Sequence, residues 1–222
     1  MVLTLNNIDI KEALYAPFLD SADITPDVIS AKLDEIKKSK IANSPWKSKF
    51  PYLPDVSFCI AHNHNNIFVK WYVSEDNIKA EYKKINDAVY RDTCVEFFIS
   101  FGEGYYNIEF NYIGNCLVGY GEDKTKRQNL PIEILETIKT SYMLKHKPNS
   151  NFSYFYWELT TVIPIDIFIH RQDLKIAGQI FSCNFYKCGD DLPKPHFLCW
   201  NMINAPEPNF HLPEFFGKIH FE

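Results

Sequence analysis

The sequence lacks the long runs of one residue class that mark several kinds of protein. Its 222 residues contain no Lys/Arg run long enough to follow a phosphate backbone, and the formal net charge is -5. No stretch approaches the ~20 apolar residues needed to cross a bilayer. These absences argue against a nucleic acid or a membrane surface as the main partner, and they favour a neutral ligand.

An export signal is also missing. The first residues, MVLTLNNIDIKEAL, contain no cationic segment followed by a continuous apolar run. We therefore expect either a cytoplasmic protein or an exported protein from which the signal has been removed. The sequence leaves the oligomeric state open.

Several local signatures of enzymes and metal sites are absent as well. The chain contains no GxSxG, no Gly-rich phosphate loop, no HExxH and no CxxC. Its cysteines lie mostly in apolar, strand-like surroundings, so we predict buried free thiols. Their even number would also permit disulfides in an oxidising compartment. The six are Cys59, Cys94, Cys116, Cys183, Cys188 and Cys199.

What the sequence does contain is a large supply of core residues in a β pattern. Hydrophobic residues make up 46% of the chain, including 18 Phe and 13 Tyr. From residue 56 onward, about ten short β-prone runs alternate with turn residues, and residues 25–40 have helical spacing after Thr25-Pro26. These patterns predict an all-β fold: a single antiparallel β-sandwich of about ten strands with a short N-terminal helix.

The chain shows no internal repeat, low-complexity tract or linker. We therefore expect one domain over residues 1–222, a usual size for a single sandwich. Within it, residues 1–45 form an N-terminal arm and helix, and residues 46–222 form the sandwich.

Two of the runs, CVEFFISF and YYNIEFNY, should form a hairpin around Glu103-Gly104. A tight two-residue turn aligns their apolar faces and brings Glu96, Glu109 and Asn111 together on the opposite face. Carboxylates, amides and aromatic rings bind sugar hydroxyls and stack on pyranose rings. Alternating polar residues are equally typical of a solvated outer face, so the pattern alone leaves both interpretations open.

Candidate metal ligands are few and weakly placed. His62 and His64 lie in HNHNN, which is typical of an exposed hairpin tip. We expect no required cofactor. A structural calcium ion is left open, because carboxylates and carbonyls that suit it occur at two places, Glu75-Asp76 and Gly189-Asp190-Asp191.

Two tryptophans are in phase with apolar neighbours. Trp71 alternates with Val69 and Val73, and Trp200 alternates with Leu198. Alternation therefore favours core packing for both rings.

Several segments, taken in order, resemble carbohydrate-binding family 9. They are KWYV with the following Glu75, RDTCVEFFISF, YYNIEFNYIG and the closing PHFLCWNMINAPEPNFHLPEFFGKIHF. The resemblance spans about residues 46–221, and the closing segment is its most specific part. It implies a sandwich similar to DOMON domains, a structural calcium ion, and a glucan or xylan chain end or small saccharide held between two tryptophans.

The resemblance also implies roles for individual residues. Trp71 and Trp200 would be the stacking pair, and Glu109 and Asn111 the polar strand residues, on the face that also carries Glu96. Asn201, next to Trp200, is a further polar candidate.

We therefore expect non-catalytic binding of a neutral saccharide of the glucan or xylan type. One alternative is a glycoside-active enzyme that uses Glu96 and Glu109 as its pair of carboxylates. The other is a haem-binding DOMON-type sandwich, for which Met143, Met202 and the histidines provide no obvious axial pair.

Overall fold

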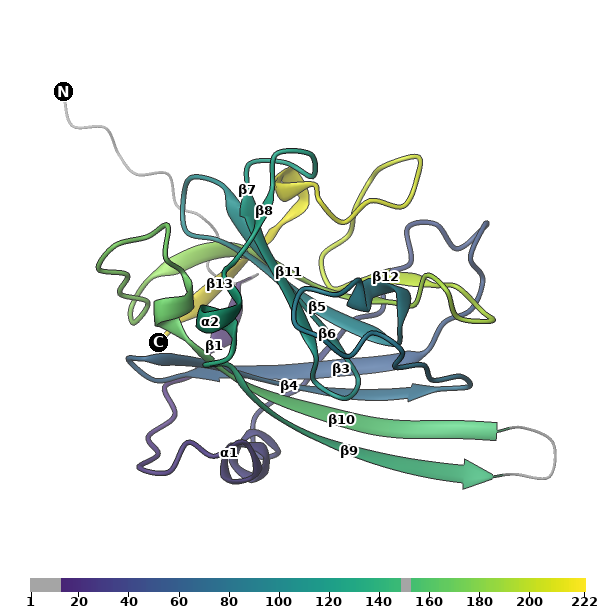
Figure 1. Ribbon diagram of the computed structural model, residues 1–222, viewed down its shortest axis with the longest axis horizontal. Coiled ribbons are helices and arrows are strands. Elements are labelled where there is room, and N and C mark those ends of the chain that lie inside the picture. Colours follow the sequence, from purple (N-terminus) through teal and green to yellow (C-terminus); the bar gives the residue numbers. More distant parts are fainter. Residues whose placement is uncertain (1–12, 149–152) are drawn as a thin grey trace.

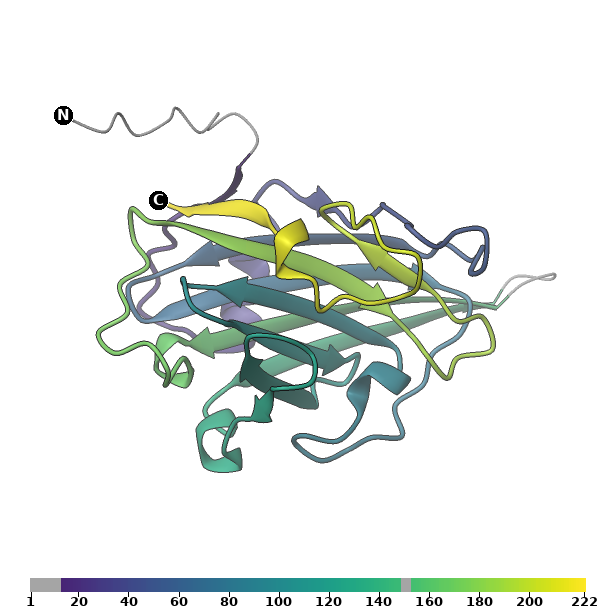
Figure 2. The ribbon, with the colours of Figure 1, turned by 90° about the horizontal axis from the view of Figure 1, so that it is seen from above.

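The computed structural model describes residues 13–148 and 153–222, and two β-sheets that face each other dominate them (Figures 1 and 2). The first part of the expected N-terminal arm lies outside the described residues. No helix in the described part of the chain is long and apolar enough to span a membrane.

The larger sheet has eight strands. Its paired strands are antiparallel, except that Leu14–Ala16 and Gly217–Phe221 pair in parallel. Cys94–Ser100 and Tyr105–Asn111 lie near its centre, so the hairpin predicted from the sequence is a central part of the fold. The order across the sheet is β1 (Leu14–Ala16), β13 (Gly217–Phe221), β11 (Ile180–Cys188), β5 (Cys94–Ser100), β6 (Tyr105–Asn111), β7 (Cys116–Gly121) and β8 (Gln128–Asn129), with β12 (Phe197–Cys199) paired to β11.

The smaller sheet has five strands, and one helix covers part of its outer face. Helix α1 (Pro26–Leu33) buries Ile29 and Leu33 against strand residues such as Phe68, and it lies below this sheet in Figure 1. The strand order is β2 (Ser39–Lys40), β3 (Asp55–His62), β4 (Asn66–Glu75), β10 (Ser153–Pro164) and β9 (Lys139–Pro148).

The main hydrophobic core lies between the sheets. Alternate residues of each strand point inward, and Phe58 of the smaller sheet stacks on Phe185 of the larger one at 3.8 Å between ring centroids. Trp71 and Trp157 are fully buried in the same core.

A second cluster of aromatic side chains covers the outer face of the larger sheet. Phe98, Tyr105 and Tyr186 project outward from the strands, and Phe210 and Phe216 of the closing segment pack on them. The part of this segment between β12 and β13, residues 200–216, crosses over the sheet as the yellow loop of Figure 2. A sheet face that would otherwise be solvated is therefore enclosed.

Short helical elements connect the strands. They are η2 (Val89–Arg91), α2 (Ile132–Leu135), η3 (Ile165–Ile167) and η4 (Pro213–Phe215).

The fold class predicted from the sequence is confirmed, and three local expectations need correction. The N-terminal helix begins after Thr25 as predicted, but it ends at Leu33, and residues 39–40 form a short strand paired with β3 instead of helix. One of the β-prone runs, residues 134–144, forms a strand only from Lys139 onward, because α2 (Ile132–Leu135) overlaps its start. The β5–β6 connection is a loop of four residues, 101–104, rather than a two-residue turn, with positive φ at Gly102 and Gly104. All six cysteines are buried and free, as predicted.

Candidate functional site

The outer face of the β5–β6 hairpin carries two carboxylates side by side. Glu96 and Glu109 are direct cross-strand partners, and each is only 3% exposed. They share this face because residues that are paired across an antiparallel ladder point to the same side of the sheet. The predicted alternation thus brings together two of the expected site residues.

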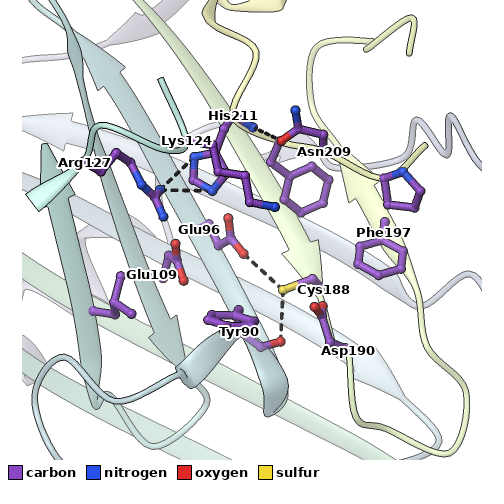
Figure 3. Close-up of a pocket in the computed structure, with 13 residues that line it drawn as sticks. Tyr90, Glu96, Glu109, Lys124, Arg127, Cys188, Asp190, Phe197, Asn209 and His211 are labelled. Carbon is purple, nitrogen blue, oxygen red and sulfur yellow. Dashed lines mark hydrogen bonds between the residues drawn. The ribbon is translucent and has the colours of Figure 1, made fainter. Parts of the chain in front are cut away.

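A cavity of about 200 Å³ lies above these two carboxylates (Figure 3). β5 and β6 supply its floor, and β12 and the closing segment supply Phe197, Phe210 and His211. The connection between β7 and β8 adds two cations, Lys124 and Arg127, and η2 adds Tyr90. Its volume is below the roughly 300 Å³ of pockets for drug-sized ligands, so it suits one small ring rather than a long chain.

Burial and mutual repulsion change the acid–base behaviour of the floor. Burial raises the pKa of Glu96 well above its usual range, and the neighbouring charge of Glu109 raises it further. Burial also raises the pKa of Glu109, to about 7, although the positive charge of Arg127 opposes this rise. Two carboxyls in this position favour sharing a proton or accepting hydrogen bonds from a ligand.

The Glu109 carboxyl is only half satisfied by the protein. Its Oε1 atom accepts a hydrogen bond of 2.8 Å from Asn107 Nδ2. Its Oε2 atom is buried and has no hydrogen-bond partner within the described residues. A buried acceptor without a partner costs about 1–3 kcal/mol. A hydroxyl group in the cavity would remove that cost.

The cationic wall of the cavity is held by a histidine. Arg127 Nη1 lies 2.8 Å from Nδ1 and 3.0 Å from Nε2 of His211, and the Tyr105 hydroxyl lies 3.0 Å from the same Nδ1. Burial, assisted by the charge of Arg127, lowers the pKa of His211 to about 3. The imidazole is therefore neutral and accepts hydrogen bonds, and it fixes the guanidinium near the carboxylates.

Aromatic side chains border the same space. Tyr90 and Phe197 line it and are partly exposed, whereas Phe210 is nearly buried and stacks on Tyr186 at 4.2 Å between centroids. Partly exposed rings beside carboxylates and a guanidinium are typical of sites for polyhydroxylated ligands.

The structure places Asn111 outside the cavity lining, contrary to the expectation that it contacts the ligand. Its Nδ2 atom donates to Tyr82 O at 2.8 Å and to Asp92 Oδ2 at 3.0 Å, and its Oδ1 atom accepts from the Asn115 backbone N–H. Every polar atom of this side chain is thus used to hold neighbouring loops.

The expected tryptophan pair is corrected in the same way. Trp71 is 0% exposed and packs in the main core, so neither of its ring faces is available to a sugar. Trp200 is partly buried and packs against Phe58 and Phe185, on the inner side of the sheet, away from the carboxylates. The neighbouring Asn201 donates from Nδ2 to Phe215 O at 2.8 Å and braces η4.

Other parts of the site were not recognised from the sequence. They reach the cavity from loops, from the short helix η2 or from the short strand β12, and they are Tyr90, Arg127, Phe197, Asn209 and His211. The dense aromatic and polar composition of the closing segment was the available signal, because its aromatic residues need apolar surface to pack on.

The first of the two places expected to suit calcium does not fit the ion. Glu75 is fully buried, with Oε2 3.2 Å from Lys187 Nζ and Oε1 accepting from Trp157 Nε1 at 2.7 Å. Asp76 pairs with Lys194. A lysine ammonium therefore already occupies the position that a cation would take beside Glu75.

At the second place the two aspartates point to different surroundings. Asp191 lies 3.8 Å from Arg91 and 3.9 Å from Lys79, whereas Asp190 lines the cavity. Of the two histidines considered as metal ligands, His64 is exposed as expected for a hairpin tip, but His62 is buried, with Nε2 2.6 Å from Glu222 O.

Comparison with known proteins identifies relatives along nearly the whole chain. The profile of carbohydrate-binding family 9 matches residues 25–221. A candidate carbohydrate-binding protein from Bacteroides uniformis shares 34% sequence identity, with a TM-score of 0.86 over 95% of this chain and 99% of the other. Among curated proteins, no sequence matches significantly.

Two more distant structures show the same fold. A carbohydrate-binding module of family 9 from Caldicellulosiruptor kristjanssonii, in complex with glucose, is 14% identical, with a TM-score of 0.58 over 95% of this chain and 96% of the other. Its complex with cellotriose gives 15% identity and a TM-score of 0.57, over 95% and 94% of the two chains.

Proposed function

Because the chain belongs to carbohydrate-binding family 9, we propose that it binds the end of a neutral glucan or xylan oligosaccharide in the cavity above Glu96 and Glu109. The main support for this proposal is the buried Glu109 Oε2 atom. It has no hydrogen-bond partner within the described residues, and Glu109 lies on the cavity floor. The family 9 module from C. kristjanssonii was solved with glucose and with cellotriose, and these ligands guide the choice of sugar.

The side chains around the cavity would bind different parts of the sugar in such a complex. Glu109 Oε2 accepts a sugar hydroxyl, and the Arg127 guanidinium donates to another sugar oxygen. Tyr90 and Phe197 cover the apolar C–H face of the ring. The small volume admits one residue, so the remainder of an oligosaccharide extends out of the cavity between the loops.

The placement of the carboxylates favours binding over hydrolysis. A glycosidase needs two carboxyls that flank the scissile bond, one to protonate the leaving oxygen and one to attack or to activate water. Glu96 and Glu109 are neighbours on one sheet face and both belong to the cavity floor (Figure 3). They therefore approach a ligand from the same side.

Calorimetric titration with glucose, cello-oligosaccharides and xylo-oligosaccharides tests the proposal. We expect saturable binding to at least one series, and a loss of roughly tenfold or more in affinity for Tyr90→Ala and for Arg127→Ala. Tyr142→Ala is the matched control, because Tyr142 is an exposed tyrosine of β9 that does not line the cavity.

Two results would contradict the proposal. One is the absence of binding heat across both sugar series. The other is equal weakening by Tyr142→Ala and Tyr90→Ala, which would place the sugar on another surface. Release of reducing sugar from the same oligosaccharides would instead favour the enzymatic alternative.

A further inference from the structure

Two cysteines meet beside the carboxylates, and one of them, Cys188, lines the cavity. Cys94 on β5 and Cys188 on β11 are direct cross-strand partners, so both side chains point to the outer face of the sheet. Cys188 Sγ donates to Glu96 Oε1 at 3.1 Å. The two residues come from distant parts of the chain, and sequence spacing alone does not reveal their pairing.

The three side chains place potential ligand atoms close together. The two Sγ atoms and a Glu96 carboxylate oxygen all lie within 4.8 Å of one another. In a tetrahedral zinc site, bonds of about 2.3 Å to sulfur separate two thiolates by about 3.8 Å. Small side-chain adjustments are therefore enough to bring these atoms onto one ion.

The site is enclosed but has an entrance. Cys94 is 0% exposed and Cys188 1%, whereas Cys188 and Glu96 both line the cavity. The cavity therefore leads to Cys188 and Glu96, and the Cys94 sulfur lies within 4.8 Å of their ligand atoms. The neighbouring Glu109, which also lines the cavity, keeps a carboxylate oxygen without a partner within the described residues.

From this geometry we propose that Cys94, Cys188 and Glu96 form a binding site for a thiophilic divalent cation such as Zn²⁺. Two thiolates with one carboxylate suit a borderline-soft ion, whereas Ca²⁺ and Mg²⁺ require oxygen ligands. Both thiols lose their protons as the ion binds. The inference does not depend on the sugar proposal, since the ion needs only these three side chains.

The charges around the three ligands are consistent with a cation there. Buried thiols and carboxyls are unfavourable as anions unless a positive charge is close. Arg127 and Lys124 line the same cavity, and the ammonium of Lys187 bonds to the Cys188 carbonyl at 2.9 Å on the buried side. A divalent ion would leave one net negative charge on the two thiolates and Glu96, which these three cations would offset.

Titration of the reduced protein with Co²⁺ and Zn²⁺ tests the site directly. We expect one ion per chain, visible d–d bands of tetrahedral cobalt, and a sulfur-to-cobalt charge-transfer band. Calorimetry in buffers with different ionisation enthalpies should show the release of about two protons per ion, because both thiols start protonated. These readouts need no substitution and no sugar.

Variants then assign the ligands. Cys188→Ser should abolish the charge-transfer band or weaken Co²⁺ binding by at least roughly 100-fold, and Glu96→Gln should weaken it by roughly tenfold or more. Cys183→Ser is the matched control, because Cys183 lies on the same strand but in the main core. It should bind Co²⁺ like the wild type.

Several outcomes overturn the inference. They are the absence of a charge-transfer band in the reduced wild type, the release of no protons, or an unchanged band in a folded Cys188→Ser protein. Formation of a Cys94–Cys188 disulfide that persists under reducing buffer would also overturn it, since it would remove both thiolates.

Discussion

Glu96 and Glu109 face each other across β5 and β6, and both are almost completely buried. Two carboxyls so close together repel when both are ionised. Burial raises the pKa of each, and the charge of Glu109 raises that of Glu96 further. A stable fold has no need of such a pair. Its cost is therefore best explained by what the pair can bind in the cavity above it.

Replacement of one carboxylate should stabilise the protein and weaken sugar binding. Glu109→Gln removes a buried charge, and its amide oxygen can still accept from Asn107 Nδ2. In metal-free protein at pH 8 we expect the free energy of unfolding to rise by about 1–3 kcal/mol, while sugar affinity falls roughly tenfold. Urea unfolding and calorimetry measure the two effects.

The exposed Glu103, in the β5–β6 loop, supplies the control for this variant. Glu103→Gln removes the same charge from the chain but leaves the cavity intact, so both quantities should stay near their wild-type values. A Glu109→Gln protein that is less stable than the wild type would show that the ionised carboxylate contributes to folding.

Substitution of a glycine beside the cavity floor should weaken sugar binding, although this residue does not line the cavity. Gly119 on β7 is the cross-strand partner of Asn107, and a Cβ atom there would lie 2.8 Å from Asn107 Oδ1. Gly119→Ala therefore displaces Asn107, which in turn holds Glu109. We expect a loss of about 1–3 kcal/mol in stability and a clear loss of sugar affinity.

Gly217→Ala separates these two effects. A Cβ atom at Gly217 would lie 2.6 Å from the Trp200 ring, on the other side of the sheet from the carboxylates. This substitution should cost similar stability but leave sugar affinity unchanged when both are measured below the unfolding transition. Equal losses of affinity in both variants would mean that general destabilisation explains the effect.

The sequence was sufficient to predict the floor of the site but not its walls. Alternation with period two is a local property, so it placed Glu96 and Glu109 on one face without knowledge of the rest of the fold. Arg127 and His211 are in contact although they are 84 positions apart. Such contacts depend on how the closing segment crosses the sheet, which no short-range pattern encodes.

For the two tryptophans, by contrast, the local sequence pattern gave the correct prediction. Their alternation with Val69 and Leu198 predicted core packing, whereas the family resemblance implied a stacking pair. The burial of Trp71 and the packing of Trp200 against Phe185 agree with the local pattern. For these two residues, the face of the strand therefore predicted the environment of the side chain better than the presence of a tryptophan did.

A buried ion pair at the edge of the core should contribute strongly to stability. Lys187 Nζ lies 3.2 Å from Glu75 Oε2 and 2.8 Å from His196 Nε2, and all three residues are 0–1% exposed. Lys187→Met leaves the Glu75 carboxylate buried without its cation. We expect a loss of about 3–5 kcal/mol in the free energy of unfolding.

The double variant Glu75→Gln/Lys187→Met should recover part of that loss, because Gln retains an acceptor for Trp157 Nε1. Lys40→Met is the control: it breaks the exposed pair with Asp55 and should cost less than about 1 kcal/mol. If the single and double variants are equally unstable, the uncompensated charge is not the cause.

Acidification should destabilise the protein in part through His196. Its ring is neutral in the fold, with Nε2 accepting from Lys187 and Nδ1 donating to Lys194 O. Burial, with the charge of Lys187, lowers the pKa of His196 to about 2.

In the unfolded chain a histidine has a pKa of about 6.5. Below that pH the His196 imidazole binds a proton in the unfolded state but stays neutral in the folded state. The free energy of unfolding therefore falls as the pH falls. The expected contribution of His196 is a loss of about 1.4 kcal/mol for each pH unit below about 6.

The variant His196→Gln tests this contribution, because glutamine stays neutral and can still accept a hydrogen bond from Lys187. Its unfolding free energies, measured in urea between pH 7 and 4.5, should fall less steeply than those of the wild type. His64→Gln, which changes an exposed imidazole, should retain the wild-type slope, and an unaltered slope in His196→Gln would assign the acid sensitivity to other groups.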